Sequence, residues 1–576
     1  MRLILLQRLC PRHIRPAVTQ VPFLTPKHPR WITPSVNSIC FQHNRLKTYP
    51  GTSFQHNRLK TYPGTRSFCQ FVELTTRSRP TIFALSSGHG KCGVGVIRIS
   101  GPKASDVVLA MTGRSSLPEP RLATVGALYH PISREMLDRG LVLWFPGPAS
   151  FTGEDVCELH VHGGPAVINA IHEALEGMPD VQYAEAGEFT KRAFLNGKLD
   201  LTEVEGMADL IHAETEAQRK QALRQMEGEL GRMYADWRNR LLRTLAHVEA
   251  YIDFSEDENI EEGVLEQAQD EANVLLKEIQ SHLADNRRGE RLRNGVHVAI
   301  LGKPNVGKSS LLNAICQRPA AIVSPLAGTT RDVVESAVNI GGYPVVLSDT
   351  AGLRKSEDVV EREGVRRARQ RAREADIKVI MLNALHLQTT FSTMAHPNQH
   401  IQRLMEDFKL TSQSSTIYSD DESNGDDEKT QPKNEFPDAE TIIVLNKLDL
   451  VEEHRESLEK MCQQGIREVN GTGSMPCCVL SSKTGIGLER FLEVLRDKVK
   501  DMCGNPLTGN PSLTQARHRR YLNRCLNSLY DFEKQDDIVK AAEHLRIALR
   551  HLGKMTGRVG AEEILDVVFG DFCIGK

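Results

Sequence analysis

The chain of 576 residues has no apolar run that approaches the ~20 residues needed to cross a bilayer, so its sequence predicts no membrane span. Its 12 cysteines lack the spacing of metal sites, and we interpret them as reduced thiols. The formal net charge is only -2, so any surface that binds RNA must be a local basic patch. The length is too great for one core and predicts several domains.

Residues 1–78 are almost without acidic side chains, since Glu73 is the single one, although 12 lysines and arginines lie among them. This segment is also rich in His, Pro, Ser and Thr. Such a composition is typical of an organelle-targeting leader, and we interpret it as a disordered mitochondrial transit peptide. The alternative is a basic tail with no targeting role.

Periodicity divides the remaining chain. Strand patterns at residues 81–85, 94–100, 141–145 and 156–162 predict an α+β domain over residues 79–198. Apolar residues then recur at steps of three and four from Leu223 to Ile252, and again from Tyr521 to Leu552, which predicts long amphipathic helices. We therefore expect a helical domain formed by residues 199–293 plus 511–576, into which an α/β domain at residues 294–505 is inserted.

Residues 385–440 interrupt the α/β pattern with an acidic stretch that is poor in apolar side chains. We predict a disordered surface insertion. A docking site for a partner is the alternative.

The segment GKPNVGKS at residues 302–309 matches the phosphate-loop pattern G-x-x-x-x-G-K-S/T. It follows a buried-strand pattern at residues 296–301 and opens a helix, as this loop requires. Its glycines let backbone N–H groups converge on phosphates, and the helix N-terminus adds positive potential. Lys308 is placed for the β- and γ-phosphates and Ser309 for Mg²⁺.

Sequence segments after the phosphate loop predict that the site binds guanine and not adenine. In NKLD at residues 446–449, the Asp449 carboxylate can accept hydrogen bonds from the ring N–H and the exocyclic amine of guanine, and adenine lacks these donors. SSK at residues 481–483 closes over the base. GTTRD at residues 328–332 and DTAG at residues 349–352 supply the switches, with Thr330 for Mg²⁺. We expect GTP contacts from Asn305, Val306, Gly307, Lys308, Ser309, Ser310, Ser324, Gly328, Thr329, Thr330, Asp349, Thr350, Ala351, Gly352, Asn446, Lys447, Asp449, Ser481, Ser482 and Lys483.

The sequence shows neither of two groups that many GTPases use to hydrolyse GTP. Leu353 stands where many GTPases carry a glutamine that orients water, and no arginine finger is evident. Another positive group must therefore neutralise the charge that develops on the phosphates. A cation beside the phosphate loop would serve, and Asn305 offers it an oxygen ligand.

Motifs outside the α/β segment carry a family resemblance. They are residues 93–101, 151–156, 162–165, 187–190, 192–200 and the C-terminal FCIGK at residues 572–576. Together with the nucleotide motifs, they resemble the tRNA-modification GTPases of the MnmE (TrmE) family from Thr81 to the C-terminus. The leader makes the chain similar to the mitochondrial branch in animals.

The resemblance implies an N-terminal domain that forms a homodimer and binds 5,10-methylene- or 5-formyl-tetrahydrofolate. Arg98, Glu158 and Lys198 match the folate contacts, and Lys576 approaches from the tail. Arginine and lysine suit the glutamates of folate, and a carboxylate suits its pterin. Glu158 also shares a strand with His160 and His162, but we see no third ligand for a metal. Cys573 is either a buried small side chain or a reactive thiol.

For hydrolysis, the resemblance implies activation by K⁺ and by approach of two GTPase domains. Asn305, Ser324, Leu326 and Thr329 match the K⁺ ligands, and Glu361 matches a glutamate that orients water. The expected catalytic set is Glu361, Lys308, Thr330 and Asn305, with Cys573 as a further candidate.

The implied function is modification of wobble uridine 34 in mitochondrial matrix tRNAs, to a 5-taurinomethyl (carboxymethylaminomethyl-type) product, with an FAD-dependent MnmG-type partner. The alternative is a ribosome-assembly or regulatory GTPase with RNA-binding flanking domains. That alternative shares the nucleotide motifs but has no use for Arg98, Glu158, Lys198 and the Cys573 to Lys576 tail.

Overall fold

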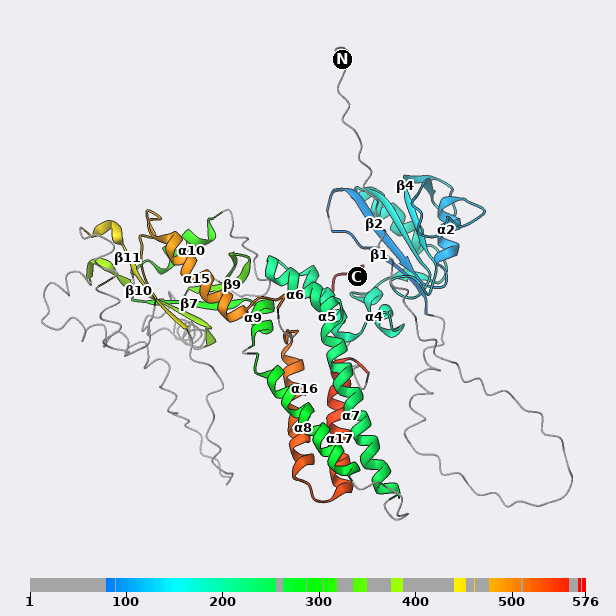
Figure 1. The fold of residues 1–576 in the computed structure, drawn as a ribbon. Coiled ribbons are helices and arrows are strands. Elements are labelled where there is room, and N and C mark those ends of the chain that lie inside the picture. Colours follow the sequence, from blue (N-terminus) through cyan, green and yellow to red (C-terminus); the bar gives the residue numbers. More distant parts are fainter. Residues whose placement is uncertain are drawn as a thin grey trace, which may run out of the picture. The chain divides into compact units, whose positions relative to one another are not determined.

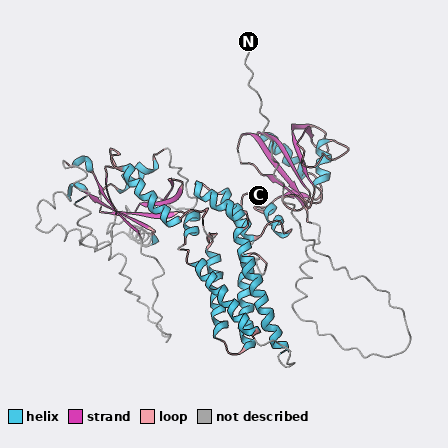
Figure 2. Cartoon of the chain, viewed as in Figure 1, coloured by secondary structure: helices cyan, strands magenta, loops and turns pink. Residues whose placement is uncertain are grey.

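The computed structural model describes residues 79–88, 90–254, 263–285, 287–303, 305–318, 335–349, 374–386, 440–451, 460, 476–508, 511–558, 568–570 and 572–576. The leader and almost all of the acidic insertion lie outside the described residues. The described segments form two sheets and a set of long helices (Figures 1 and 2).

The N-terminal sheet has six strands in the order β3-β4-β5-β2-β1-β6. Neighbouring strands are antiparallel except β1 and β6, which are parallel. Alternating apolar residues such as Ile97, Ile99 and Leu159 face a core that α2 and α3 cover. The elements are β1 Thr81–Leu85, β2 Cys92–Ser100, α2 Ala104–Thr112, β3 Thr124–Tyr129, β4 Met136–Phe145, β5 Val156–Gly163, α3 Pro165–Glu176, β6 Val181–Tyr183 and α4 Glu188–Leu195.

Four long helices form a bundle with one apolar core: α7 Glu229–Phe254, α8 Val264–Leu283, α16 Ala516–Lys534 and α17 Ile538–Met555. In this bundle α7 packs against α8 and α17, and α16 packs against the same two helices (Figure 1). The bundle core therefore joins helices from both sides of the nucleotide-binding segment.

The shorter helices α5 Leu201–Ile211 and α6 Glu216–Met226 precede the bundle helices in sequence. Another short helix, α9 Arg288–Asn294, follows α8 and leads into the second sheet. The apolar pattern that begins at Leu223 crosses the break between α6 and α7, where Gly228 has a φ of 77°. Leu223 and Met226 are accordingly only half-buried, whereas Leu230, on α7, is buried. The sequence pattern did not reveal this break, because its spacing continues across it.

The second sheet has the order β12-β11-β10-β7-β9-β8, and all its neighbours are parallel except β8 and β9. Its central strands are mostly apolar, and α10 and α15 pack on the sheet. Ala217 of α6 belongs to this core, so α6 contacts the sheet as well as α5. The elements are β7 Val296–Gly302, α10 Lys308–Cys316, β8 Glu335–Ile340, β9 Tyr343–Asp349, β10 Ile377–Asn383, β11 Glu440–Asn446, η1 Leu448–Leu450, β12 Cys477–Val479 and α15 Leu488–Cys503.

A buried carboxylate joins α5 to α16. Glu205 pairs with Arg517, and its other oxygen lies 3.0 Å from His518 Nε2. Burial alone would raise the pKa of Glu205, but His518 and Arg517 outweigh it and lower the pKa to about 2. Burial also lowers the pKa of His518, although the neighbouring Glu205 carboxylate opposes this shift.

We expect Glu205→Gln to lower the free energy of unfolding of the bundle by about 3 kcal/mol at pH 7, because Arg517 loses its counter-charge. The native carboxylate stabilises the fold above its unfolded pKa, near 4.5, and this contribution is lost as the pH falls toward 2. Urea unfolding at several pH values measures the difference. It should shrink below pH 4.5, while Glu533→Gln, at an exposed site on α16, should change little. Equal stability of Glu205→Gln and the native chain at pH 7 would contradict this role.

Candidate functional site

The phosphate loop leaves the carboxyl end of β7 and enters α10. Asn305 and Gly307 have φ values of 63° and 102°, which turn the backbone sharply at the helix start. Lys308 is buried, and its Nζ donates to the carbonyls of Gly302 at 3.0 Å and Lys303 at 3.3 Å. The N-cap residue of α10 is Gly307, which has no side chain to cap the helix. The N-terminal N–H groups and the Lys308 ammonium can therefore bind an anion at this loop.

One buried amide ties the phosphate loop to the base-binding loops. Asn446 Nδ2 donates to the Val306 carbonyl at 2.7 Å. Asn446 Oδ1 accepts from the backbone N–H and the hydroxyl of Ser482 at 2.9 and 3.0 Å. A Cβ atom at Gly307 would lie 2.3 Å from Asn446 Nδ2, so this contact also excludes any larger residue from position 307. Asn446 therefore fixes the spacing between the phosphate and base ends of the site.

Asp449 is exposed on η1, and Ser481 orients it. The buried Ser481 hydroxyl donates to Asp449 Oδ1 at 2.6 Å and accepts from the backbone N–H of Thr484 at 3.3 Å. The hydrogen bond from Ser481 lowers the pKa of Asp449, which is therefore ionised at neutral pH. An oriented, exposed carboxylate matches the paired donors on the Watson–Crick edge of guanine and rejects adenine. Lys447 and Lys483 flank this carboxylate and favour its charge.

Parts of the expected site lie outside the described residues: Ser324, Leu326, Gly328, Thr329, Thr330, Thr350, Ala351, Gly352, Leu353 and Glu361. Asp349 ends β9 in register with Ile300 of β7. The DTAG segment therefore starts beside the strand that carries the phosphate loop. Ser309 and Ser310 lie in the first turn of α10, next to Lys308.

A second polar site lies on the N-terminal sheet, where Arg98 of β2 is in register with Glu158 of β5. Arg98 Nε lies 3.0 Å and its terminal nitrogen 2.9 Å from Glu158 Oε1. The guanidinium also lies 5.3 Å from the Phe151 ring and 5.8 Å from the Phe189 ring. The structure thus brings together a cation, a carboxylate and two aromatic rings, which suits a flat ligand with both N–H donors and anionic groups.

The C-terminal tail reaches this domain. Ile574 forms a bridge with Ala186, and the Ser86 hydroxyl donates to the Gly575 carbonyl at 2.8 Å. A Cβ atom at Gly575 would lie 2.3 Å from the Leu85 carbonyl, so the approach requires glycine. Leu85 ends β1, which pairs with the strand that bears Arg98. The tail therefore ends beside the Arg98 strand.

Three further residues were expected near this site: Lys576, Lys198 and Cys573. Lys576 is half-buried at the end of the tail, and Lys198 is exposed after α4. In the described part of the chain, the Lys198 ammonium forms no ion pair with Glu158. Cys573 is exposed, so the interpretation of this residue as a buried small side chain is wrong. An exposed thiol on the tail keeps the second interpretation open.

The two histidines of β5 have carboxylate neighbours. His162 Nδ1 lies 2.8 Å from Asp138 Oδ1, and His160 Nε2 lies 3.4 Å from Glu158 Oε2. Among the residues that the structure describes, no group of three His, Cys, Asp or Glu side chains gathers as a metal site would require.

Sequence reasoning missed a buried guanidinium next to the N-terminal site, that of Arg192. Arg192 donates to Glu154 at 3.0 Å, to Glu188 at 2.8 Å and to the Pro80 carbonyl at 3.0 Å. Ser100, two residues after Arg98, donates to the same Glu154 oxygen at 2.8 Å. All these positions but Pro80 fall inside or at the edge of the motifs that carry the resemblance. The recurrence of Glu and Arg in those motifs was the available signal, but their partners are far apart in sequence.

We expect Asp449→Asn to weaken GTP binding by at least about 100-fold, because the amide N–H₂ would face the guanine donors. Xanthosine triphosphate has a carbonyl in place of the exocyclic amine, so it should bind this variant better than GTP does. Competition against a fluorescent guanine nucleotide measures both affinities. Asp501→Asn, at an exposed position on α15, is the matched control and should bind GTP normally. Undiminished GTP binding by Asp449→Asn would rule out this carboxylate as the guanine acceptor.

None of the described helices is long and apolar enough to cross a membrane.

Comparison with known proteins covers most of the chain. The family description "GTP-binding protein TrmE N-terminus" matches residues 81–198, and "MnmE helical domain" matches residues 201–573. A mitochondrial 5-taurinomethyluridine-tRNA synthase subunit GTPB3 of Danio rerio is 51% identical over 499 residues, which are 86% of this chain and 93% of that protein. The Homo sapiens protein of the same name is 49% identical over 499 residues, 87% of this chain and 94% of its own. A tRNA modification GTPase MnmE of Rickettsia bellii is 42% identical over 497 residues, 86% of this chain and all of its own length. Because this similarity extends through both the Arg98 site and the nucleotide motifs, the chain belongs to the MnmE (TrmE) family.

Proposed function

We propose that this chain is a mitochondrial GTPase that acts in modification of the wobble uridine of tRNA. The observation that carries the proposal is the match to relatives named 5-taurinomethyluridine-tRNA synthase subunit, which extends over 93% of the Danio rerio protein. The exposed Asp449 carboxylate and the preformed phosphate loop support GTP as the nucleotide. Mg²⁺ would lie at Ser309, in the first turn of α10, and at Thr330.

In this proposal residues 79–198 form the folate-binding and dimerisation domain, and residues 294–505 form the GTPase domain. The helical domain comprises residues 199–293 plus 511–576. The single core shared by α7, α8, α16 and α17 supports an insertion of the GTPase domain into the helical one. Residues 1–78 are proposed as the transit peptide.

We assign the tetrahydrofolate site to Arg98 and Glu158, with Lys198 and Lys576 at its edge. The register of β2 and β5 and the two flanking rings support this assignment. Folate, when bound, supplies the one-carbon unit, as 5,10-methylene- or 5-formyl-tetrahydrofolate. The protein's part is to orient the pterin through a carboxylate and to hold the glutamate charges with basic groups. The homodimer and the FAD-dependent MnmG-type partner are proposed from the family resemblance alone.

GTP hydrolysis in this proposal needs K⁺, since the chain has Leu353 in place of a glutamine. Asn305 is exposed on the phosphate loop, so its side-chain oxygen is available as one ligand, with Ser324, Leu326 and Thr329 as the others. Glu361 would orient the attacking water. Lys308 and K⁺ would then stabilise the charge that develops on the phosphates.

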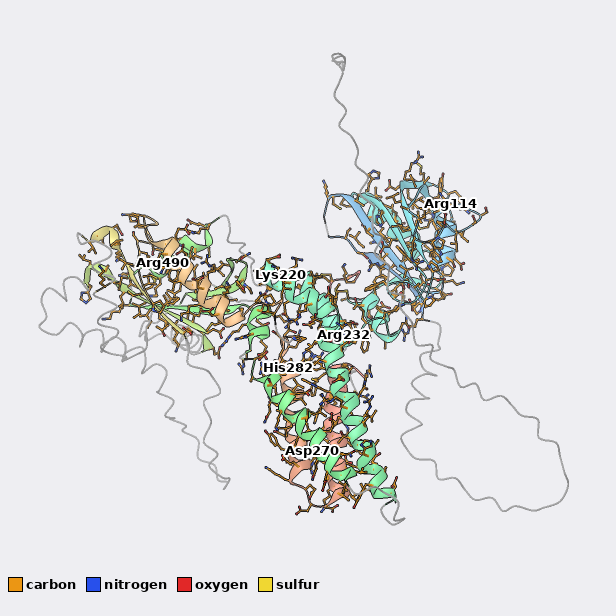
Figure 3. All side chains as sticks on the ribbon, in the orientation of Figure 1. Arg114, Lys220, Arg232, Asp270, His282 and Arg490 are labelled. Atoms are coloured by element: carbon orange, nitrogen blue, oxygen red, sulfur yellow. The ribbon has the colours of Figure 1, made fainter. Side chains whose placement is uncertain are left out.

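Loss of the chain should remove the 5-taurinomethyl group from uridine 34 of mitochondrial tRNAs. Mass spectrometry of wobble nucleosides from cells that lack the gene measures this loss. Re-expression of the native chain should restore the group, while Arg98→Gln should fail to restore it and yet keep its GTPase activity. Arg114→Gln is the control, because Arg114 is an exposed cation of the same domain, labelled in Figure 3. Normal wobble uridines in cells without the chain would refute the proposal.

Replacing K⁺ by Na⁺ at equal ionic strength should slow GTP hydrolysis by at least about tenfold, because the cation replaces a missing arginine finger. Single-turnover hydrolysis measures the rate, and GDP affinity in the two salts is the control, which should stay equal. Identical rates in K⁺ and Na⁺ would disprove the cation role.

A further inference from the structure

The helices α16 and α17 carry a concentration of positive charge outside both sites described above. Residues 515–530 contain four arginines, and residues 544–558 contain three arginines and one lysine. Neither stretch has an acidic residue. The net charge of the whole chain is only -2, so these stretches are a local excess of one sign. A local basic surface of this kind is the electrostatic feature that nucleic-acid-binding faces share.

The fold brings the two basic stretches together, because α16 and α17 pack against each other (Figure 1). Arg517, in the first turn of α16, donates to the carbonyl of Met555 at the end of α17. Tyr521, one turn later on α16, stacks on His551, one turn earlier on α17. The two helices are therefore antiparallel, and both basic stretches lie at the same end of the pair.

Three of these cations are neutralised by carboxylates within the fold. Their pairs are Arg517 with Glu205, Arg519 with Asp285 and Glu290, and Arg546 with Glu249 and Glu543. Four others form no ion pair within the described residues: Arg520, Arg524, Arg550 and Lys554. The three arginines of this group are exposed, and Lys554 is half-buried. We call these four residues the basic patch; the remaining cation, Arg558, lies beyond the end of α17.

Three cations of the basic patch act on one imidazole, that of His551. Burial lowers the pKa of His551, and the charges of Arg524, Lys554 and Arg550 lower it further. Lys554 Nζ also lies 5.9 Å from the centroid of the Tyr521 ring, which stacks on His551 with centroids 6.2 Å apart. Both neighbours of the ring are thus supplied by α17, so the basic patch offers a partner positive charge and no free aromatic face.

The basic patch places like charges side by side along each helix. Arg520 and Arg524 are four residues apart on α16, and Arg550 and Lys554 are four residues apart on α17. Residues at this spacing are neighbours on a helix surface, and like charges there destabilise the helix. An anion bound between them would relieve the repulsion. Phosphate is the anion that the planar donors of arginine match best.

We propose that the basic patch binds the phosphate backbone of tRNA through Arg520, Arg524, Arg550 and Lys554. The inference rests on the proposed function, since tRNA is then the polyanion on which the chain acts. A polynucleotide presents closely spaced phosphates to several neighbouring cations at once, as two adjacent helices with four unpaired cations require. Contacts to phosphates position an RNA and do not read its sequence.

The test removes two charges of the basic patch from the full chain, loaded with GDP. Binding of a fluorescently labelled mitochondrial tRNA transcript is measured by anisotropy over a range of salt concentrations. The double variant Arg524→Gln with Arg550→Gln should weaken binding by about tenfold and lower the slope of log affinity against log salt by about 1.5, because two phosphate contacts are lost. Affinity for a second tRNA of unrelated sequence should fall by the same factor.

Thermal unfolding separates a loss of binding from a loss of fold. The double variant should unfold at the native temperature or slightly above it, because one charge of each like pair is gone. If it unfolds at a lower temperature, the single variants Arg524→Gln and Arg550→Gln carry the test. Each of them should weaken binding by about threefold and lower the slope by about 0.7.

Lys277→Gln with Lys534→Gln is the matched control, since it removes the same charge from exposed positions on α8 and at the far end of α16. It should leave the affinity and the salt slope unchanged. Unlabelled tRNA should displace the label far better than polyglutamate does at the same concentration of anionic groups. Equal displacement by polyglutamate would overturn the assignment to RNA and indicate an acidic protein as the partner.

No tRNA binding by the native chain, native affinity in the patch variants, or an equal loss in the control would also overturn the inference. The proposed function is tested separately, by the wobble nucleosides of cells that lack the chain. If the 5-taurinomethyl group depends on the chain while the patch variants bind tRNA normally, only the patch assignment is wrong. If the patch variants lose tRNA binding while wobble uridines stay normal without the chain, the proposed function is wrong and the RNA-binding surface stands.

Discussion

The buried carboxylate of Glu205 joins two stretches of chain that lie on opposite sides of the nucleotide-binding segment. Its partners Arg517 and His518 stand more than three hundred residues further along the chain. Around this contact, Gln225 of α6 donates to the Thr202 carbonyl and accepts from the Thr514 hydroxyl at 2.8 Å. A charge in a dry core must be matched, so this contact specifies how α5 meets α16. The bundle core that follows can then form from helices that are remote in sequence.

In the nucleotide site, too, single buried side chains connect segments that are distant in sequence. One amide, Asn446, spans from the phosphate loop to the loop that carries Ser481 and Ser482, and one hydroxyl, Ser481, aims Asp449. Asn446 and Ser481 are buried, whereas Asn305 and Asp449 are exposed. These bonds hold the phosphate loop and the guanine loops in place before GTP binds.

Much of the site was predictable because it depends on local chain geometry. A phosphate loop needs a strand, glycines and a helix within about fifteen residues, and these leave a sequence pattern. Apolar periodicity likewise predicted the α7 stripe. By contrast, the contacts of Arg192 with Pro80, Glu154 and Glu188 depend on tertiary packing, and no spacing encodes them. The burial of Gln221 is a similar case, since a glutamine in a polar helix carries no signal of burial.

A backbone hydrogen bond also connects the second sheet to helix α6. The turn between β8 and β9 presents the Gly342 carbonyl, which accepts from the backbone N–H of Ala217 at 3.1 Å. Ala217 packs in the core of the sheet, and Gln221, one turn further along α6, is buried. The two expected switch segments flank this hairpin, because one ends before β8 and the other follows β9. The N-terminal end of α6 is thus bonded to the hairpin between β8 and β9. The described residues therefore connect the hairpin beside the phosphate-loop strand to α6, and Gln225 continues the contact to α5 through the Thr202 carbonyl.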